Sequence, residues 1–343
     1  MARSPLRVAA ALFGLCWVLL ASGANAAACD AGASDACYFG FAPPAAQGRL
    51  HYYASIAPET SAAAPTRALI ALHGHPRDAG KTFDAALRAV RQGGRGGDAL
   101  VVAPVFQVDA ARAARCSTPG VPAAQPGDLL WTCASWLEGA PSENGAGLGA
   151  FAALDALVAE LVRQWPGLRV VTVAGFSAGA QMVQHAIGFA APAPAGVALR
   201  YVVADPGTWL YFDTFRPAPV DAAACPEANR WKYGLDALPP HLPRTAAQAR
   251  ESYAAAEIHY LEGALDSGDG KGTAYRALDK SCAADAQGPF RLQRGQAYVA
   301  HEASLRTAPR EPRALVVVPG CAHDVACVFP APEARAALLG SPP

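Results

Sequence analysis

The chain has 343 residues, of which 28 are Lys or Arg and 28 are Asp or Glu, so its formal net charge is zero. With no basic run, neither nucleic acid nor an anionic membrane surface is an expected partner. Hydrophobic residues make up 52% of the chain, enough for a substantial core. Beyond the amino-terminal region no stretch is long and apolar enough for a transmembrane helix, so integral membrane association is not expected.

The amino terminus predicts a secretory signal peptide. Two arginines precede the apolar run Val8–Leu20, and Ala24–Ala26 supplies small residues for cleavage. We expect residues 1–26 to be removed and residues 27–343 to form a single domain that is secreted or periplasmic. Lipidation of Cys29 is an alternative, but the residues before it lack the bulky aliphatic side chain expected there.

Cysteine usage agrees with export. One of the nine cysteines lies in the signal peptide, and the remaining even number indicates disulfides in an oxidising compartment. The sequence does not determine the pairing, so we expect neighbours along the chain to pair. No C-x-x-C pair or close Cys/His cluster favours zinc. The expected pairs are Cys29–Cys37, Cys116–Cys133, Cys225–Cys282 and Cys321–Cys327.

Short β-rich runs alternate with helical stretches. The first, Gly48–Ile56, alternates in hydropathy and predicts an antiparallel strand near the sheet edge. The later runs are continuously apolar, which suits parallel strands buried on both faces. Those runs are Ala68–His73, Leu100–Phe106, Val170–Ala174, Tyr201–Asp205, Ile258–Glu262 and Leu315–Pro319.

A helix is predicted just before the strand Val170–Ala174, ending at Pro166-Gly167. The alternation of strand and helix predicts an α/β fold: a mainly parallel central sheet with helices on both faces. The segments Asp109–Gly147 and Pro206–Pro243 do not fit the alternation, and we expect long loop insertions tied by their cysteines. The apolar face of the helix consists of Phe151, Leu154, Leu157, Val158, Leu161 and Trp165.

The segment Gly175-Phe176-Ser177-Ala178-Gly179 follows a predicted strand and opens a predicted helix. This is the G-x-S-x-G nucleophile elbow in the context that it requires. A side chain at either glycine would collide with the neighbouring strand and helix. The bare pattern also arises by chance as a Gly-rich turn, so the flanking strand and helix carry the prediction that Ser177 is a nucleophile.

A serine hydroxyl needs a base to remove its proton. His323 follows the last predicted strand in a short loop, where the base belongs in a Ser, acid, His order; a surface histidine is the alternative. The acid that orients the imidazole is expected to be Asp266, which follows the strand Ile258–Glu262. Asp205 and Asp269 remain alternatives at this stage.

The oxyanion of an acyl-transfer reaction needs two backbone donors. Ala178, the residue after the nucleophile, is expected to supply one N–H. Pro76 has no N–H, so His75 is the candidate for the second, with Arg77 as an alternative. A metal pair of His73 and His75 is a further reading, but it has no obvious third ligand. We expect no metal and no cofactor.

The chain resembles a family of secreted, largely uncharacterised α/β-hydrolases related to esterases, lipases and polyester depolymerases. The resemblance spans most of the chain after the signal peptide, and it implies an α/β-hydrolase fold with Ser177, Asp266 and His323 as the triad. Phe176 departs from the His often found in the elbow, which bears on pocket shape. The resemblance is carried by LHGHPRDAGKTF, GAFAALDALVAEL, VAGFSAGAQMVQ, RYVVADPGTWLYFD, WKYGLDALPP, YLEGALDSGD, SCAADAQGPFRLQRG and VPGCAHD.

The expected function is hydrolysis of a small-molecule or polymeric carboxylic ester through an acyl-enzyme. Four aromatic residues in the two insertions are expected to line an apolar pocket or groove, although packing of the loops is the alternative for each. Two other functions stay open: a peptidase or amidase with the same triad, and a non-catalytic binding protein on a hydrolase scaffold. The four residues are Trp131, Trp136, Trp209 and Tyr211.

Overall fold

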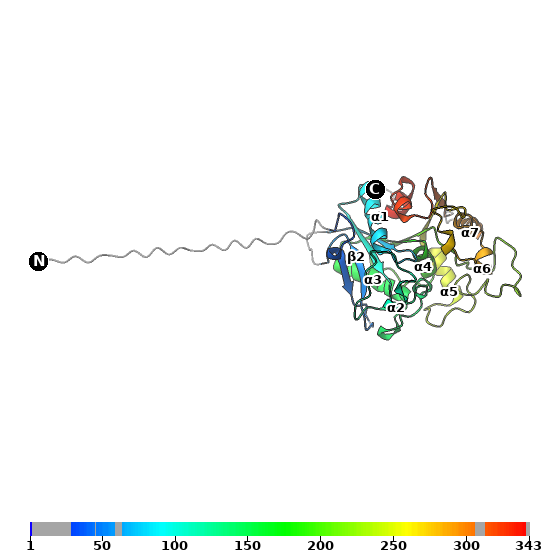
Figure 1. Cartoon of the computed structure of the whole chain (residues 1–343), viewed down its shortest axis with the longest axis horizontal. Coiled ribbons are helices and arrows are strands. Elements are labelled where there is room, and N and C mark those ends of the chain that lie inside the picture. The colour runs from blue at the N-terminus through cyan, green and yellow to red at the C-terminus, as the bar shows by residue number, and fades with distance from the viewer. Residues whose placement is uncertain (2–28, 45, 59–63, 306–312, 341–343) are drawn as a thin grey trace.

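The computed structural model of the chain is shown in Figure 1. Apart from Met1, the signal peptide predicted for residues 1–26 lies outside the residues that the structure describes. Within those residues, no helix has both the length and the apolar character needed to cross a bilayer. The described residues are 1, 29–44, 46–58, 64–305 and 313–340.

The core of the protein is an eight-stranded sheet in the order β1-β2-β4-β3-β7-β8-β9-β10. β2 pairs antiparallel with β1 and β4, and the other pairs are parallel. The six parallel strands and the antiparallel one near the edge are therefore confirmed, whereas β1 is short and was not predicted. The strands are β1 (Tyr38–Phe41), β2 (Leu50–Ala54), β3 (Arg67–Leu72), β4 (Ala99–Val105), β7 (Val170–Phe176), β8 (Ala198–Ala204), β9 (Glu257–Gly263) and β10 (Leu315–Val318), with β5 (Gln107–Val108) and β6 (Leu130–Trp131) in a separate pair.

Helices cover both faces of the sheet, as predicted. Side chains alternate along each strand: in β3, Ile70 and Leu72 pack with α3 and α4, and Leu69 and Ala71 pack with α1. Figure 1 shows α5, α6 and α7 at the end of the molecule opposite β2. The α-helices are α1 (Ala79–Gln92), α2 (Ala110–Ala113), α3 (Ala150–Gln164), α4 (Ala178–Ile187), α5 (Ala246–Ala255), α6 (Cys282–Asp285), α7 (Arg291–Leu305), α8 (Val325–Val328) and α9 (Arg335–Leu339), and 3₁₀ turns span Asp35–Cys37, Ser135–Glu138, Gly145–Gly147, Tyr275–Ala277 and Pro332–Ala334.

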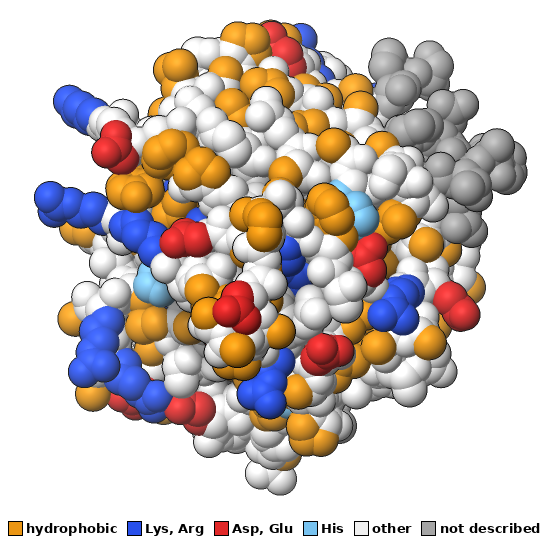
Figure 2. Space-filling model, turned by 90° about the vertical axis from the view of Figure 1, so that its right-hand side faces the viewer, with side chains coloured by type: hydrophobic (Ala, Val, Ile, Leu, Met, Phe, Trp, Pro, Cys, Tyr) orange, Lys and Arg blue, Asp and Glu red, His pale blue; other side chains and the backbone are white. Residues whose placement is uncertain are grey.

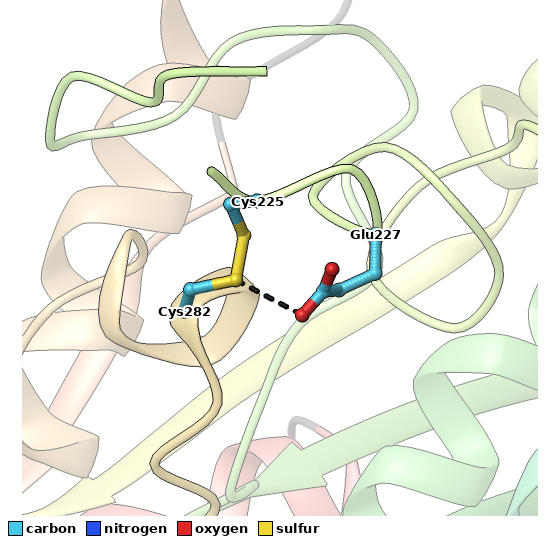
Figure 3. A group of neighbouring side chains, drawn as sticks. All are labelled: Cys225, Glu227 and Cys282. Carbon is cyan, nitrogen blue, oxygen red and sulfur yellow. Dashed lines mark hydrogen bonds between the residues drawn. A yellow bond between two sulfur atoms is a disulfide. The ribbon is translucent and has the colours of Figure 1, made fainter. Parts of the chain in front are cut away.

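Four disulfides join the cysteines in the predicted pairs: Cys29–Cys37, Cys116–Cys133, Cys225–Cys282 and Cys321–Cys327. The third of them ties the second long insertion to α6, and there the Glu227 carboxylate lies 2.9 Å from the Sγ of Cys282 (Figure 3). The possible ligand atoms of Cys225, Glu227 and Cys282 are close enough together to hold a metal ion. Because both sulfurs are in the disulfide, they are not available as thiolate ligands.

The surface agrees with the zero net charge. On the face shown in Figure 2, acidic and basic side chains are interspersed among apolar and uncharged ones. In open α/β sheets ligands bind at the carboxyl ends of the parallel strands, so we expect the functional site there.

Candidate active site

Ser177 stands on a sharp turn between β7 and α4, with backbone angles φ 58° and ψ −120°. Positive φ in a residue with a side chain costs free energy and persists where the surrounding structure enforces it. Here close packing around the turn enforces the positive φ of Ser177. A Cβ at Gly175 would lie 2.2 Å from the Gly179 carbonyl oxygen, and one at Gly179 would lie 2.5 Å from that of Leu72. The elbow therefore requires both glycines, as the motif predicts.

The side chains of Ser177, His323 and Asp266 form a continuous hydrogen-bonded chain. Ser177 Oγ lies 2.8 Å from His323 Nε2, and His323 Nδ1 lies 2.7 Å from Asp266 Oδ2. The three residues follow β7, β10 and β9, whose carboxyl ends meet at one edge of the sheet. An imidazole that donates its Nδ1 hydrogen to Asp266 has Nε2 free to accept the serine proton. This is the geometry of an activated nucleophile.

The loop that carries His323 is held from several sides. The backbone N–H of His323 donates to the Gly272 carbonyl at 3.0 Å, and the Cys321–Cys327 disulfide brackets the residue. Asp324 caps α8 and pairs with Lys81 Nζ at 2.8 Å. These contacts fix the imidazole over the serine.

Phe176 covers one side of the His323 imidazole, with ring centroids 4.8 Å apart. The Phe176 side chain is buried between His323 and Phe329 and also lines the active-site cavity. The departure from His in the elbow thus makes this part of the cavity wall apolar. Burial lowers the pKa of His323 below its usual 6.5, while the hydrogen bond to Asp266 opposes that shift.

Of the three candidate acids, Asp266 is the one that accepts a hydrogen bond from His323. Asp269 is exposed. Asp205 is fully buried at the end of β8, but its Oδ1 accepts the Gly263 N–H at 2.7 Å. Ligand atoms of Asp205, Asp266 and His323 all lie within 4.8 Å of one another, close enough for a metal ion. The bond between His323 and Asp266 already uses two of the atoms that such an ion would need.

A second buried carboxyl, Glu262, lies beside Asp205, and sequence reasoning missed it. Burial raises the pKa of Asp205 to about 7, and burial together with the negative charge of Asp205 raises the pKa of Glu262 well above its usual range. At neutral pH the pair therefore holds at least one proton. Glu262 could have been found from the sequence, because it is a charged residue in the otherwise apolar run Ile258–Glu262. Such a position in a parallel sheet faces protein and not water.

Arg291 is the cation next to these carboxyls, and sequence reasoning missed this residue too. It is the first residue of α7 and is 3% exposed. Its Nη1 donates to the Thr273 carbonyl at 2.7 Å and lies 3.4 Å from Asp266 Oδ1. The guanidinium therefore forms a buried ion pair with Asp266.

A cavity of about 550 Å³ opens over Ser177, and Ala178 and His75 line it. The Arg77 N–H donates to the Gly74 carbonyl at 3.0 Å, which leaves His75 as the candidate for the second oxyanion donor. The ring of His73 is buried with both nitrogens engaged, by the Gly74 carbonyl at 2.8 Å and the Phe106 N–H at 3.2 Å. A metal pair with His75 is therefore not formed.

The aromatic residues expected in the substrate pocket do not line this cavity, so that prediction is wrong. All four are at most 1% exposed. The indole N–H groups of Trp131 and Trp136 donate to the Ala140 and Cys133 carbonyls, and the ring of Trp209 stacks on Tyr298. They anchor the irregular insertions to the core, which is what large apolar side chains in long ordered loops must do. The four residues are Trp131, Trp136, Trp209 and Tyr211.

Comparisons with known proteins agree with this architecture. No protein-family model and no curated protein sequence matches the chain. Its structure is similar to that of poly(aspartic acid) hydrolase-1 from Sphingomonas sp. KT-1, with 20% sequence identity, 88% of this chain and 97% of that chain covered, and a TM-score of 0.59. It is also similar to a poly(3-hydroxybutyrate) depolymerase from Bordetella parapertussis, with 19% identity, 84% and 83% covered, and a TM-score of 0.54. The strand order, the elbow and these similarities show that the chain has the α/β-hydrolase fold.

Proposed function

We propose that the protein is a serine hydrolase that cleaves carboxylic esters, with Ser177 as nucleophile, His323 as base and Asp266 as acid. The observation that carries the proposal is the unbroken hydrogen-bonded chain from Ser177 Oγ through His323 to Asp266 at the floor of an open cavity. His323 takes the serine proton as Oγ attacks the ester carbonyl, and gives it to the departing alkoxide. A water molecule, deprotonated by the same imidazole, then releases the acid from the acyl-enzyme.

The developing oxyanion would be stabilised by the backbone N–H groups of Ala178 and His75. Ala178 is the first residue of α4, where N–H groups have no partner within the helix and the helix dipole favours negative charge. The proximity of the two loops supports His75 as the second donor: a Cβ at Gly74 would lie 3.5 Å from Ser177 Cβ. These groups need no metal or cofactor for acyl transfer.

The substrate is proposed to be a small-molecule or polymeric ester in an oxidising compartment, secreted or periplasmic. Four disulfides fit such a compartment. The two similar structures are named for polymer hydrolysis, which supports a polymer as substrate. Amide hydrolysis by the same triad is the second candidate, because poly(aspartic acid) is joined by amide bonds.

The proposal is tested by covalent labelling and by turnover. The native wild-type protein should react with a fluorophosphonate probe and hydrolyse p-nitrophenyl esters of graded acyl length, and a peptide panel run beside them should react more slowly. Absence of labelling under native conditions would remove the enzyme proposal. Faster turnover of the amides would favour the second candidate.

The buried base predicts a shifted pH profile. Because burial lowers the pKa of His323 below 6.5, its neutral, active form should persist to lower pH than that of an exposed histidine. The acid limb of kcat/KM for p-nitrophenyl butyrate should therefore have its midpoint below pH 6.5. An acid limb centred above pH 7 would contradict the assignment of this imidazole as the base.

A further inference from the structure

The wall of the cavity contains a buried cation with unused donors. Arg291 lines the cavity beside His323 and commits only Nη1, to the Thr273 carbonyl and to Asp266. Within the described residues, Nε is buried without a hydrogen-bond partner and Nη2 has none either. A guanidinium offers five N–H donors in a planar fork that suits a carboxylate. Because Nε is enclosed by protein, the donors left for a molecule in the cavity are the two N–H groups of Nη2.

The cavity wall also contains a second cation. Lys232 lines the same cavity, and its Nζ has only long ion pairs, 3.3 Å to Glu138 and 3.7 Å to Asp279. Asp279 is already engaged, since it accepts from the Tyr233 hydroxyl at 2.6 Å. Burial lowers the pKa of His75, and the charges of Arg77 and then Lys232 lower it further.

Three other charged residues line the cavity: Asp279, which pairs with Lys232, and then Lys81 and Asp78. Lys81 is neutralised by Asp324 at 2.8 Å. Asp78 lies near the turn at Gly74, where its Oδ1 would be 3.8 Å from a Cβ on that glycine. Its negative charge makes the Gly74 side unfavourable for an anion. An anionic group of the substrate is therefore directed to the Arg291 side.

The direction of proton transfer indicates which part of the substrate contacts Arg291. In the proposed mechanism His323 gives its proton to the leaving group, so the leaving group must lie beside that imidazole. Arg291 belongs to the same wall: it lines the cavity, and its Nη1 lies 3.4 Å from Oδ1 of Asp266, the residue hydrogen-bonded to His323. The cation is thus next to the leaving group.

We propose that Arg291 binds a carboxylate on the leaving-group part of the substrate. The preferred substrates are then esters whose alcohol carries a free carboxylate, as the terminal unit of a hydroxy-acid oligomer does. This inference rests on the proposed ester hydrolysis. In this role Arg291 is a specificity-determining residue: it distinguishes substrates by the charge on the leaving group and not by their chain length.

The test compares two esters that differ only in that charge: 4-acetoxybenzoate and its neutral analogue 4-acetoxybenzamide. Wild type should hydrolyse the anionic ester with a kcat/KM at least about tenfold higher, the effect of one charge-assisted hydrogen bond. In Arg291→Met the ratio of the two kcat/KM values should fall to about one, and Arg291→Lys should recover part of it. Because Arg291 also touches Asp266, a purely structural role would slow both esters equally and leave the ratio unchanged.

Arg276→Met is the matched control, because it removes the same charge from an exposed position outside the cavity lining. It should leave the ratio as in wild type. Calorimetric binding of 4-hydroxybenzoate and 4-hydroxybenzamide to wild type tests the same point without any variant or turnover. No preference for the carboxylate in wild type overturns the inference alone, whereas failure to hydrolyse either ester overturns the proposed function.

Discussion

Replacing Ser177 with alanine should abolish labelling by a fluorophosphonate probe and lower kcat on p-nitrophenyl esters by about 10⁶, the loss typical of a removed serine nucleophile. The reason is geometric. Ser177 Oγ is the only triad atom that can form the acyl-enzyme, and its imidazole partner is 2.8 Å away. Alanine is smaller and has the same backbone connectivity, so the elbow and the cavity should persist. Probe fluorescence on a denaturing gel and steady-state rates measure the two effects.

Ser142→Ala is the matched control for this experiment. Ser142 is buried, its hydroxyl donates to the Asn144 carbonyl at 2.6 Å, and it does not line the cavity. Its replacement should leave both labelling and kcat close to wild type. If Ser177→Ala still becomes labelled at the wild-type rate, the nucleophile lies elsewhere.

Replacing Asp266 with asparagine should lower kcat by about 10⁴, because the amide can donate to His323 Nδ1 and so stabilise the wrong tautomer. Asp266 Oδ2 accepts from that nitrogen at 2.7 Å. Asp205→Asn should have a much smaller effect. Burial raises the pKa of Asp205 to about 7, so this carboxyl is largely protonated at slightly acidic pH, and it bonds Gly263 instead of the imidazole.

The two asparagine variants form a matched pair, since each removes one ionisable buried carboxyl of the same cluster. Rates at pH 6.5 and thermal melting of both proteins separate catalysis from stability. A larger loss of kcat in Asp205→Asn than in Asp266→Asn, at equal melting temperature, would make Asp205 the acid.

Features that depend on local sequence were predictable. The apolar runs revealed the parallel strands because strands buried on both faces tolerate few polar residues. The elbow was predictable because its two glycines and its flanking strand and helix are contiguous in the chain. The order of Ser177, Asp266 and His323 then followed from where the strands end, since the carboxyl ends of parallel strands meet at one edge.

Features that depend on which way a side chain faces were not predictable. Trp136 and Trp209 lie in loops near the site, but their sequence neighbourhood does not say whether they face the core or the cavity. Arg291 and Glu262 were missed for the opposite reason. Each reads as an ordinary residue of a helix start or a strand, and only the long-range packing of α7 on β9 brings them to the triad.

The short covalent ring closed by Cys321 and Cys327 links the timing of activity to location. That bond forms only where thiols are oxidised. In a reducing compartment the loop would keep its contacts to Gly272 and Lys81 but lose the covalent link that brackets His323. If the protein is exported as proposed, its hydrolytic activity is therefore expected to rise once this bond has formed.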